Sequence, residues 1–197
     1  MTNNLPKIVI CEGLSEYAYI QELNRLLIRG RYSTPYIPAL PESGNFSSIT
    51  KEFKNQKKKN KNSDVLIWVD KDIYVRQKAD STKYSMKKSY IPDFLFSVWN
   101  FEDFLVLHKE RKEILFWQEK CSEFGHLSHP CSAEEHLKLF RKYMFPDYEK
   151  GTLPFDLTRE RIELLFSNLK ISDYKFSCEF LEFVQKEIQN KTLRFIR

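Results

Sequence analysis

Two short apolar runs end in acidic residues, and these acids are the side chains best suited to chemistry. Lys7–Cys11 (KIVIC) is followed by Glu12, and Val65–Val69 (VLIWV) is followed by Asp70 and Asp72. Short unbroken runs rich in β-branched residues are typical of buried strands in a parallel sheet. Because functional groups of open α/β sheets gather beyond the carboxyl ends of the strands, the three carboxylates should converge if the strands are neighbours.

Three converging carboxylates would suit a hard cation such as Mg²⁺ or Mn²⁺, which binds oxygen ligands together with substrate phosphates. Asp70 and Asp72 are two residues apart, so a continuing strand would place both on one face, where they can share an ion. Glu12 could bind the metal or transfer a proton. The alternative for Asp70 and Asp72 is that aspartate is simply favoured at a turn or at a helix start. The alternative for Glu12 is that it is only a turn residue beside Gly13. We favour a metal site, which predicts metal-assisted phosphodiester chemistry.

A second pair of candidates follows in Phe101–Leu107, where the pattern predicts a helix. Glu102 stands among aromatic residues, where an acid is not expected to be buried without a partner. His108 is six residues further on, close to the same helix face. The two could add a metal ligand and a proton carrier, or they could be a buried hydrogen-bonded pair that anchors the helix to the sheet. Glu16 is expected to have at most a supporting role, because glutamate is common at helix starts.

The lysines are unevenly distributed in a chain of 197 residues with a net charge of +5. Residues 51–61 hold six lysines and one glutamate. Basic segments beside an acidic metal site could attract a polyanion, although a lysine run is more often only a solvated face. The lysines expected to contact nucleic acid are Lys57, Lys58, Lys59, Lys71, Lys87 and Lys88, with Lys83 in the last cluster.

Cysteines and histidines gather between residues 121 and 136, namely Cys121, His126, His129, Cys131 and His136. They resemble zinc ligands, but their spacing matches no standard finger and lacks a paired C-x2-C. A zinc site is therefore an open alternative to free thiols in a reducing compartment. No apolar run reaches the roughly 18 residues needed to span a bilayer, and no signal-peptide pattern is present, so a cytoplasmic protein is expected.

The remaining pattern predicts an α/β fold. Strands are expected at 7–11, 65–69 and 91–98, with an edge strand within the proline-rich segment 32–40. Helices are expected at 15–28, 47–59, 101–107, 113–124, 133–143, 158–169 and 178–189. The order β-α-(β)-α-β implies right-handed crossovers and a mainly parallel sheet. Residues 1–110 should form this core and residues 111–197 a helical extension packed on it, without a long linker.

The acidic motifs resemble those of the Toprim domain, in which Glu-Gly opens a helix and Asp-x-Asp follows a later strand. Within that superfamily the chain resembles the RloB-like proteins through CEGLSEYAY (11–19), VDKD (69–72) and SVWNFEDFLVLH (97–108). Trp99-Asn100 and Phe104 depart from the family pattern, which has a proline and a tryptophan there. The resemblance implies a Rossmann-like Toprim fold, Mg²⁺ or Mn²⁺ held by Asp70 and Asp72, and Glu12 in acid–base catalysis or metal binding.

The resemblance and the residues together predict a metal-dependent nuclease of a prokaryotic defence or restriction-type system, acting on DNA or RNA. One alternative is a Toprim subunit that works only with a partner ATPase, because the chain has no G-x4-G-K-(S/T) motif of its own. Another is a nucleic-acid-binding module with a non-catalytic site. Self-association into a homo-oligomer is left open.

Overall fold

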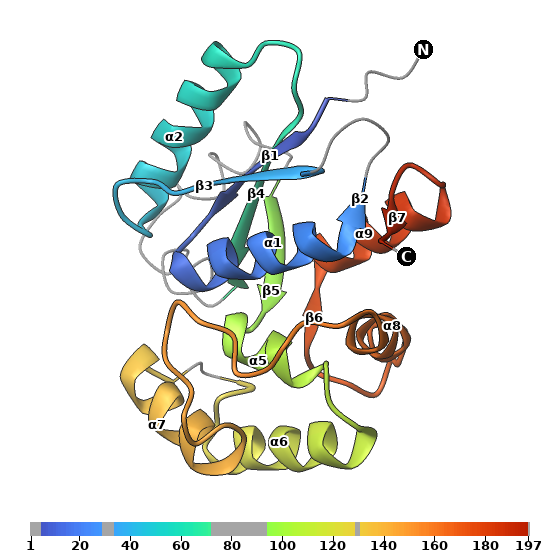
Figure 1. Cartoon of the computed structure of the whole chain (residues 1–197). Coiled ribbons are helices and arrows are strands. Elements are labelled where there is room, and N and C mark those ends of the chain that lie inside the picture. Colours follow the sequence, from blue (N-terminus) through green and yellow to red (C-terminus); the bar gives the residue numbers. More distant parts are fainter. Residues whose placement is uncertain (1–4, 29–33, 72–93, 129–130, 197) are drawn as a thin grey trace.

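The computed structural model describes residues 5–28, 34–71, 94–128 and 131–196. Its centre is a five-stranded sheet in the order β3-β1-β4-β5-β6 (Figure 1). The strands are β1 (Lys7–Cys11), β3 (Tyr36–Ala39), β4 (Val65–Asp70), β5 (Phe94–Val98) and β6 (Ser177–Cys178). The first four are parallel, and β6 is antiparallel to β5. The predicted mainly parallel, Rossmann-like α/β sheet is therefore confirmed, including the edge position of the proline-containing strand β3.

Helices cover both faces of the sheet because alternate side chains of its central strands point to opposite sides. Ile8 and Ile10 pack with Ile49 of α2 (Phe46–Lys59) on one face. Val9 packs in the larger core on the other face, together with side chains of α1 (Leu14–Leu26) and α9 (Glu179–Gln189). A strand buried on both faces has no polar positions, which explains the unbroken apolar runs in the sequence.

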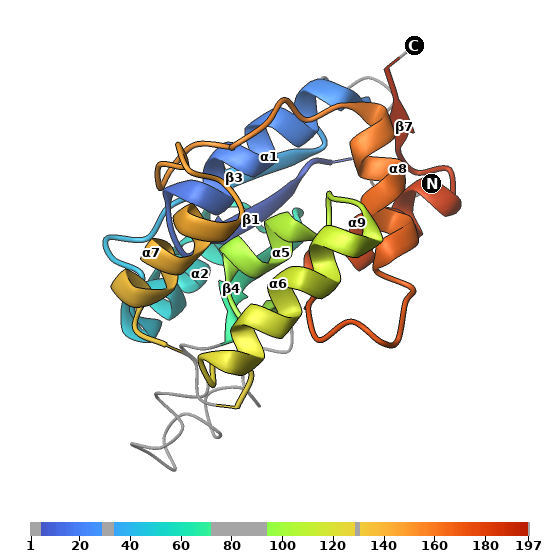
Figure 2. The same ribbon diagram turned by 90° about the horizontal axis from the view of Figure 1, so that it is seen from below.

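Further helices extend the larger core below the sheet. α5 (Phe101–Val106) lies between the sheet and α6 (Arg111–Glu123), as the two views of Figures 1 and 2 show. α7 (Ala133–Tyr143) and α8 (Arg159–Asn168) complete this half. The helices expected in residues 101–189 are confirmed, with ends that differ by no more than two residues.

Three strands of two residues each were not predicted. β2 (Leu27–Ile28) pairs antiparallel with β7 (Arg194–Phe195), and β6 joins the central sheet. A two-residue strand is too short to show an alternating pattern, so only its tertiary partner defines it. Because β6 hydrogen-bonds to β5, the part of the chain expected to be a helical extension also supplies a strand of the sheet. In the part of the chain that the structure describes, no helix has the length and apolar character to cross a membrane.

The side chain of Asn24 in α1 hydrogen-bonds to the outer backbone edge of β3, the last strand on that side of the sheet. Its side-chain amide donates a hydrogen bond to the carbonyl oxygen of Tyr36 at 2.7 Å, and its Oδ1 accepts one from the Tyr36 N–H at 3.2 Å. Both groups belong to β3, which has β1 on its other side. An outer strand otherwise offers such groups to other chains, so a helix side chain here protects the edge.

Asn24→Ala is expected to lower the free energy of unfolding by about 1–3 kcal/mol, because backbone groups at a buried position lose their partner. Urea denaturation of the purified protein measures this change. Gln21→Ala on the exposed side of the same helix is the matched control and should change stability by less than about 0.5 kcal/mol. Equal losses for the two variants would contradict the role assigned to Asn24.

Candidate active site

Glu12 and Asp70 meet at the carboxyl ends of two adjacent strands. The parallel register pairs Cys11 of β1 with Trp68 of β4, so the residues that follow lie side by side. The Glu12 N–H donates to the Trp68 carbonyl oxygen at 3.1 Å, and the Asp70 N–H donates to Glu12 Oε2 at 2.9 Å. The second bond and the shared cavity bring together Glu12 and Asp70, two of the three acids expected to converge; the third, Asp72, lies outside the described residues.

Glu16 reaches the same place from the first turn of α1. Its Oε2 accepts the Gly13 N–H at 3.1 Å, an N-terminal capping contact, and the residue is only 4% exposed. Burial raises the pKa of Glu16 to about 7, and the negative charge of Glu102 adds to this shift. Glu16 is thus held at the pocket with a carboxyl group that burial and a like charge both push toward the protonated form.

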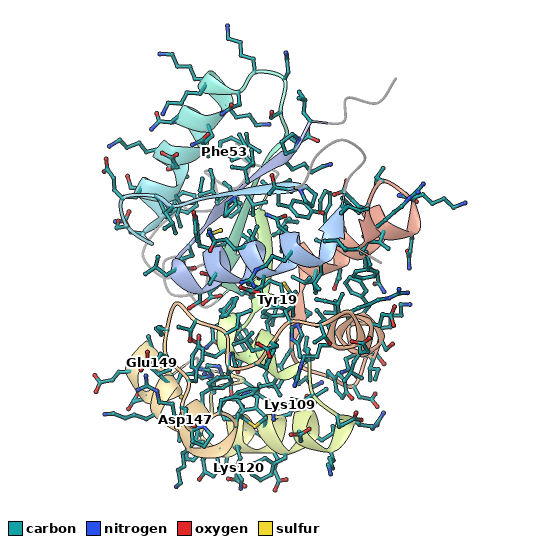
Figure 3. The ribbon with its side chains drawn as sticks, in the orientation of Figure 1. Tyr19, Phe53, Lys109, Lys120, Asp147 and Glu149 are labelled. Atoms are coloured by element: carbon teal, nitrogen blue, oxygen red, sulfur yellow. The ribbon has the colours of Figure 1, made fainter. Side chains whose placement is uncertain are left out.

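Glu102 approaches from the start of α5. Asn100 caps this helix, because its side chain accepts the Asp103 N–H at 3.0 Å. The Tyr148 hydroxyl donates to Glu102 Oε1 at 3.2 Å and also lies 3.4 Å from Ser15 Oγ. The segment between α7 and α8 therefore crosses to α1 and closes one side of the pocket; Asp147 and Glu149 in Figure 3 mark its position. Tyr148 is therefore the hydrogen-bond partner expected for Glu102, an acid that is buried among aromatic residues.

These side chains surround a cavity of about 250 Å³. Its lining holds four carboxylates and one lysine from the described residues: Glu12, Glu16, Asp70, Glu102 and Lys150. The donor atoms are oxygens, and the excess of negative charge favours a cation of the hard type. The backbone of Gly44 packs against Glu12 on the far side, where an added Cβ would lie 3.2 Å from the Glu12 carbonyl oxygen.

Asp72 lies outside the described residues, as do Lys83, Lys87 and Lys88. β4 ends at Asp70, and the expectation that Asp70 and Asp72 share one face stays a prediction. Asp70, the described member of this pair, lines the pocket.

His108 is placed apart from the acids. It follows the end of α5 and is buried in the core, where its Nε2 lies 2.8 Å from the hydroxyl of Tyr19 and its ring packs on Phe104 and Phe155. Tyr19 reaches it from α1, between the two halves of the molecule (Figure 3). Glu102 and His108 therefore do not form the pair that the helix spacing indicated, because α5 ends at Val106 and the chain turns before His108.

The lysine run lies far from the carboxylates. α2 begins just after Gly44, beside Glu12, and its 14 residues end with Lys57, Lys58 and Lys59, shortly before β4 starts. A helix of that length spans about 20 Å, so these exposed lysines stand near the opposite end of the strands (Figure 1). Lys71 is close to the site in sequence, and its Nζ lies 5.1 Å from the centre of the Trp99 ring.

Two charged residues that line the pocket, Glu16 and Lys150, were not assigned to it from the sequence. The sequence predicts at most a supporting role for Glu16. Its position three residues after Gly13 allows a capping contact with the Gly13 N–H, and this spacing could have indicated that Glu16 lies at the pocket. Lys150 belongs to no recognisable sequence motif. It lies at the site because the segment between α7 and α8 passes there.

Comparisons with protein-family models, with curated proteins and with solved structures found no match. The site is therefore interpreted from its own geometry.

The buried position of His108 predicts a particular response to acid. Its pKa is lowered from 6.5 to about 3, mainly because burial disfavours the charged ring, and Arg161 adds to this effect. Since the pKa of the folded state is below that of the unfolded state, the stability contributed by neutral His108 is complete above pH 6.5 and is lost as the pH falls toward 3.

We expect His108→Gln to be less stable than the wild type at pH 7, because the ring contacts are lost. The difference in the free energy of unfolding should shrink by up to about 1.4 kcal/mol per pH unit on acidification, since glutamine does not titrate. Urea denaturation at several pH values between 7 and 4 measures this. A difference that stays constant with pH would argue against a buried neutral His108.

Proposed function

We propose that this chain is a nuclease dependent on Mg²⁺ or Mn²⁺, with a Toprim-like core. The observation that supports this best is the contact between Glu12 and Asp70 at two adjacent strand ends, with Glu16 and Glu102 in the same cavity. A cavity with four carboxylates suits an ion that brings phosphate oxygens with it. The motif resemblance to RloB-like proteins supports a role in prokaryotic defence.

Glu12 and Asp70 would hold the ion, and Asp72 follows two residues later. A bound divalent cation would activate water and stabilise charge on the phosphate. Glu16 is positioned to bind the ion or to hold a proton, because its pKa of about 7 without a cation would fall when positive charge is near. Lys150 lines the same cavity as these acids and is suited to contact a substrate phosphate.

Cleavage assays should use DNA, RNA and tRNA with Mg²⁺ or Mn²⁺. We expect Asp70→Asn and Glu12→Gln each to reduce the rate on the order of 100-fold or more, since each removes a metal ligand. Asp64→Asn is the matched control, because this exposed aspartate precedes the other end of β4 and should retain activity. Wild-type rates in Asp70→Asn would exclude the proposed metal site.

Metal binding can be measured without a substrate. Mn²⁺ at about 100 times its dissociation constant should stabilise the folded protein by about 2.7 kcal/mol, seen as a higher Tm by differential scanning fluorimetry. The increase should be absent in Asp70→Asn and preserved in Asp64→Asn. An equal increase in all three proteins would mean that the ion binds elsewhere.

The same wild-type and variant proteins test the alternative that the site works only with a partner ATPase. If a partner ATPase activates the site, the Mn²⁺ stabilisation will be present while cleavage appears only after the ATPase and ATP are added. If neither cleavage nor stabilisation occurs, a nucleic-acid-binding module with a non-catalytic site becomes the better interpretation.

A further inference from the structure

A second group of metal-binding side chains lies in the helical half, away from the carboxylate pocket. We call Asp103, Cys121, His126 and His136 the buried Asp–Cys–His cluster. All four are at most 3% exposed. They come from α5, α6, the segment after α6 and α7, so residues distant in sequence meet here.

Asp103 is the centre of this cluster. Its Oδ2 accepts a hydrogen bond from His126 Nε2 at 2.9 Å, and its Oδ1 lies 3.0 Å from His136 Nε2. Trp117 Nε1 donates to the same Oδ1 at 2.8 Å. The histidines keep the pKa of Asp103 below its ordinary value despite complete burial. An ionised carboxylate is therefore held in an apolar core that includes Phe140.

Three donor atoms of the cluster converge closely enough to share one ion. A carboxylate oxygen of Asp103, the Sγ of Cys121 and a ring nitrogen of His136 all lie within 4.8 Å of one another. Cys121 Sγ is 4.0 Å from Asp103 Oδ1. Zinc bonds of about 2.0–2.3 Å in a tetrahedral site place donor atoms roughly 3.3–3.6 Å apart. The observed separations of 3.0 and 4.0 Å lie on either side of this spacing, so small side-chain rotations would fit them to an ion.

We propose that Asp103, Cys121 and His136 bind a structural zinc ion. Cysteine sulfur, histidine nitrogen and aspartate oxygen are all ligands that Zn²⁺ accepts, and this mixed set differs from the all-oxygen pocket at the strand ends. The proposal is independent of the nuclease proposal, because the two sites share no ligand.

Charge and protons balance in this site. Cys121 would release its thiol proton to solvent, and His136 would carry its proton on Nδ1 so that Nε2 can bind the ion. The carboxylate and the thiolate then neutralise the two charges of Zn²⁺, which removes the cost of burying an unpaired charge.

The other histidine has a different role. His126 Nδ1 accepts the N–H of Cys131 at 3.0 Å, so its ring proton is on Nε2 and is donated to Asp103 Oδ2. A donor of this kind orients a ligating carboxylate from outside the metal shell. Cys131 Sγ lies 3.9 Å from the carbonyl oxygen of Phe124, and its thiol is directed there. His129 lies outside the described residues. Among the described residues, Asp103, Cys121 and His136 supply three ligands, so one tetrahedral position remains for a further ligand.

The site would join α5 to α6 and α7. Because Asp103 directly follows Glu102, fixing it would also fix the helix start that carries Glu102 into the carboxylate pocket. Zinc at this position would not contact a substrate. It would hold α5 in place and thereby position Glu102 in the carboxylate pocket.

The full chain, produced without a histidine tag and purified without chelator, tests the proposal. Plasma mass spectrometry should find about one zinc per chain. After replacement by Co²⁺, a thiolate-to-cobalt charge-transfer band is expected, and Cys121→Ser should abolish it. Cys178→Ser is the matched control, because Cys178 is equally buried but contacts Ser97, and it should keep the band.

X-ray absorption at the zinc edge of the wild-type protein covers the case in which Cys121→Ser does not fold. One sulfur and the remainder nitrogen or oxygen neighbours would support the site. Wild-type protein without zinc, with no cobalt band and no rise in Tm on adding Zn²⁺, would overturn it. Asp70→Asn should retain its zinc, so loss of nuclease activity and loss of zinc are distinguishable.

Discussion

The parallel pairing of β1 with β4 is the constraint on which the candidate site depends. It places Cys11 beside Trp68, and from this register the Glu12 N–H reaches the Trp68 carbonyl and the Asp70 N–H reaches the Glu12 carboxylate. Two acids that are 58 residues apart in sequence are thus fixed by main-chain geometry. A shift in this register would separate the acids even if every helix still formed.

α5 connects the carboxylate pocket to the rest of the core. Its first turn carries two adjacent acids that point to different environments. Glu102 lines the pocket and accepts a hydrogen bond from Tyr148, whereas Asp103 is completely buried among Trp117, His126 and His136. Neighbouring residues on a helix point in directions about 100° apart, which lets one short helix serve both groups. Asn100 fixes where that helix begins and therefore which acid faces which side.

The two acidic environments differ in how their charge is compensated. Asp103 has three N–H donors around it, and its pKa is held below the ordinary value. In the pocket, Glu16 has a raised pKa because burial and Glu102 both oppose its charge. The first group combines one carboxylate with thiol and imidazole donors, whereas the second has several carboxylates and an excess of negative charge that a hard cation would relieve. This difference is the physical basis for proposing a catalytic ion at the strand ends.

The sequence by itself determined the helices, the four parallel strands and the first two acids of the site. Unbroken apolar runs identified β1 and β4, the prolines indicated an edge strand, and apolar periodicity located the helices, because these features depend on local pattern and burial. Only the tertiary structure decided the rest. In the tertiary structure His108 is buried in the core, whereas Glu16 and Lys150 line the pocket. Lys57–Lys59 lie near the opposite end of the strands. Asp103, Cys121 and His136 lie close together. Those outcomes depend on where helices end and which segments pack together over long sequence separations, and no local pattern carries that information.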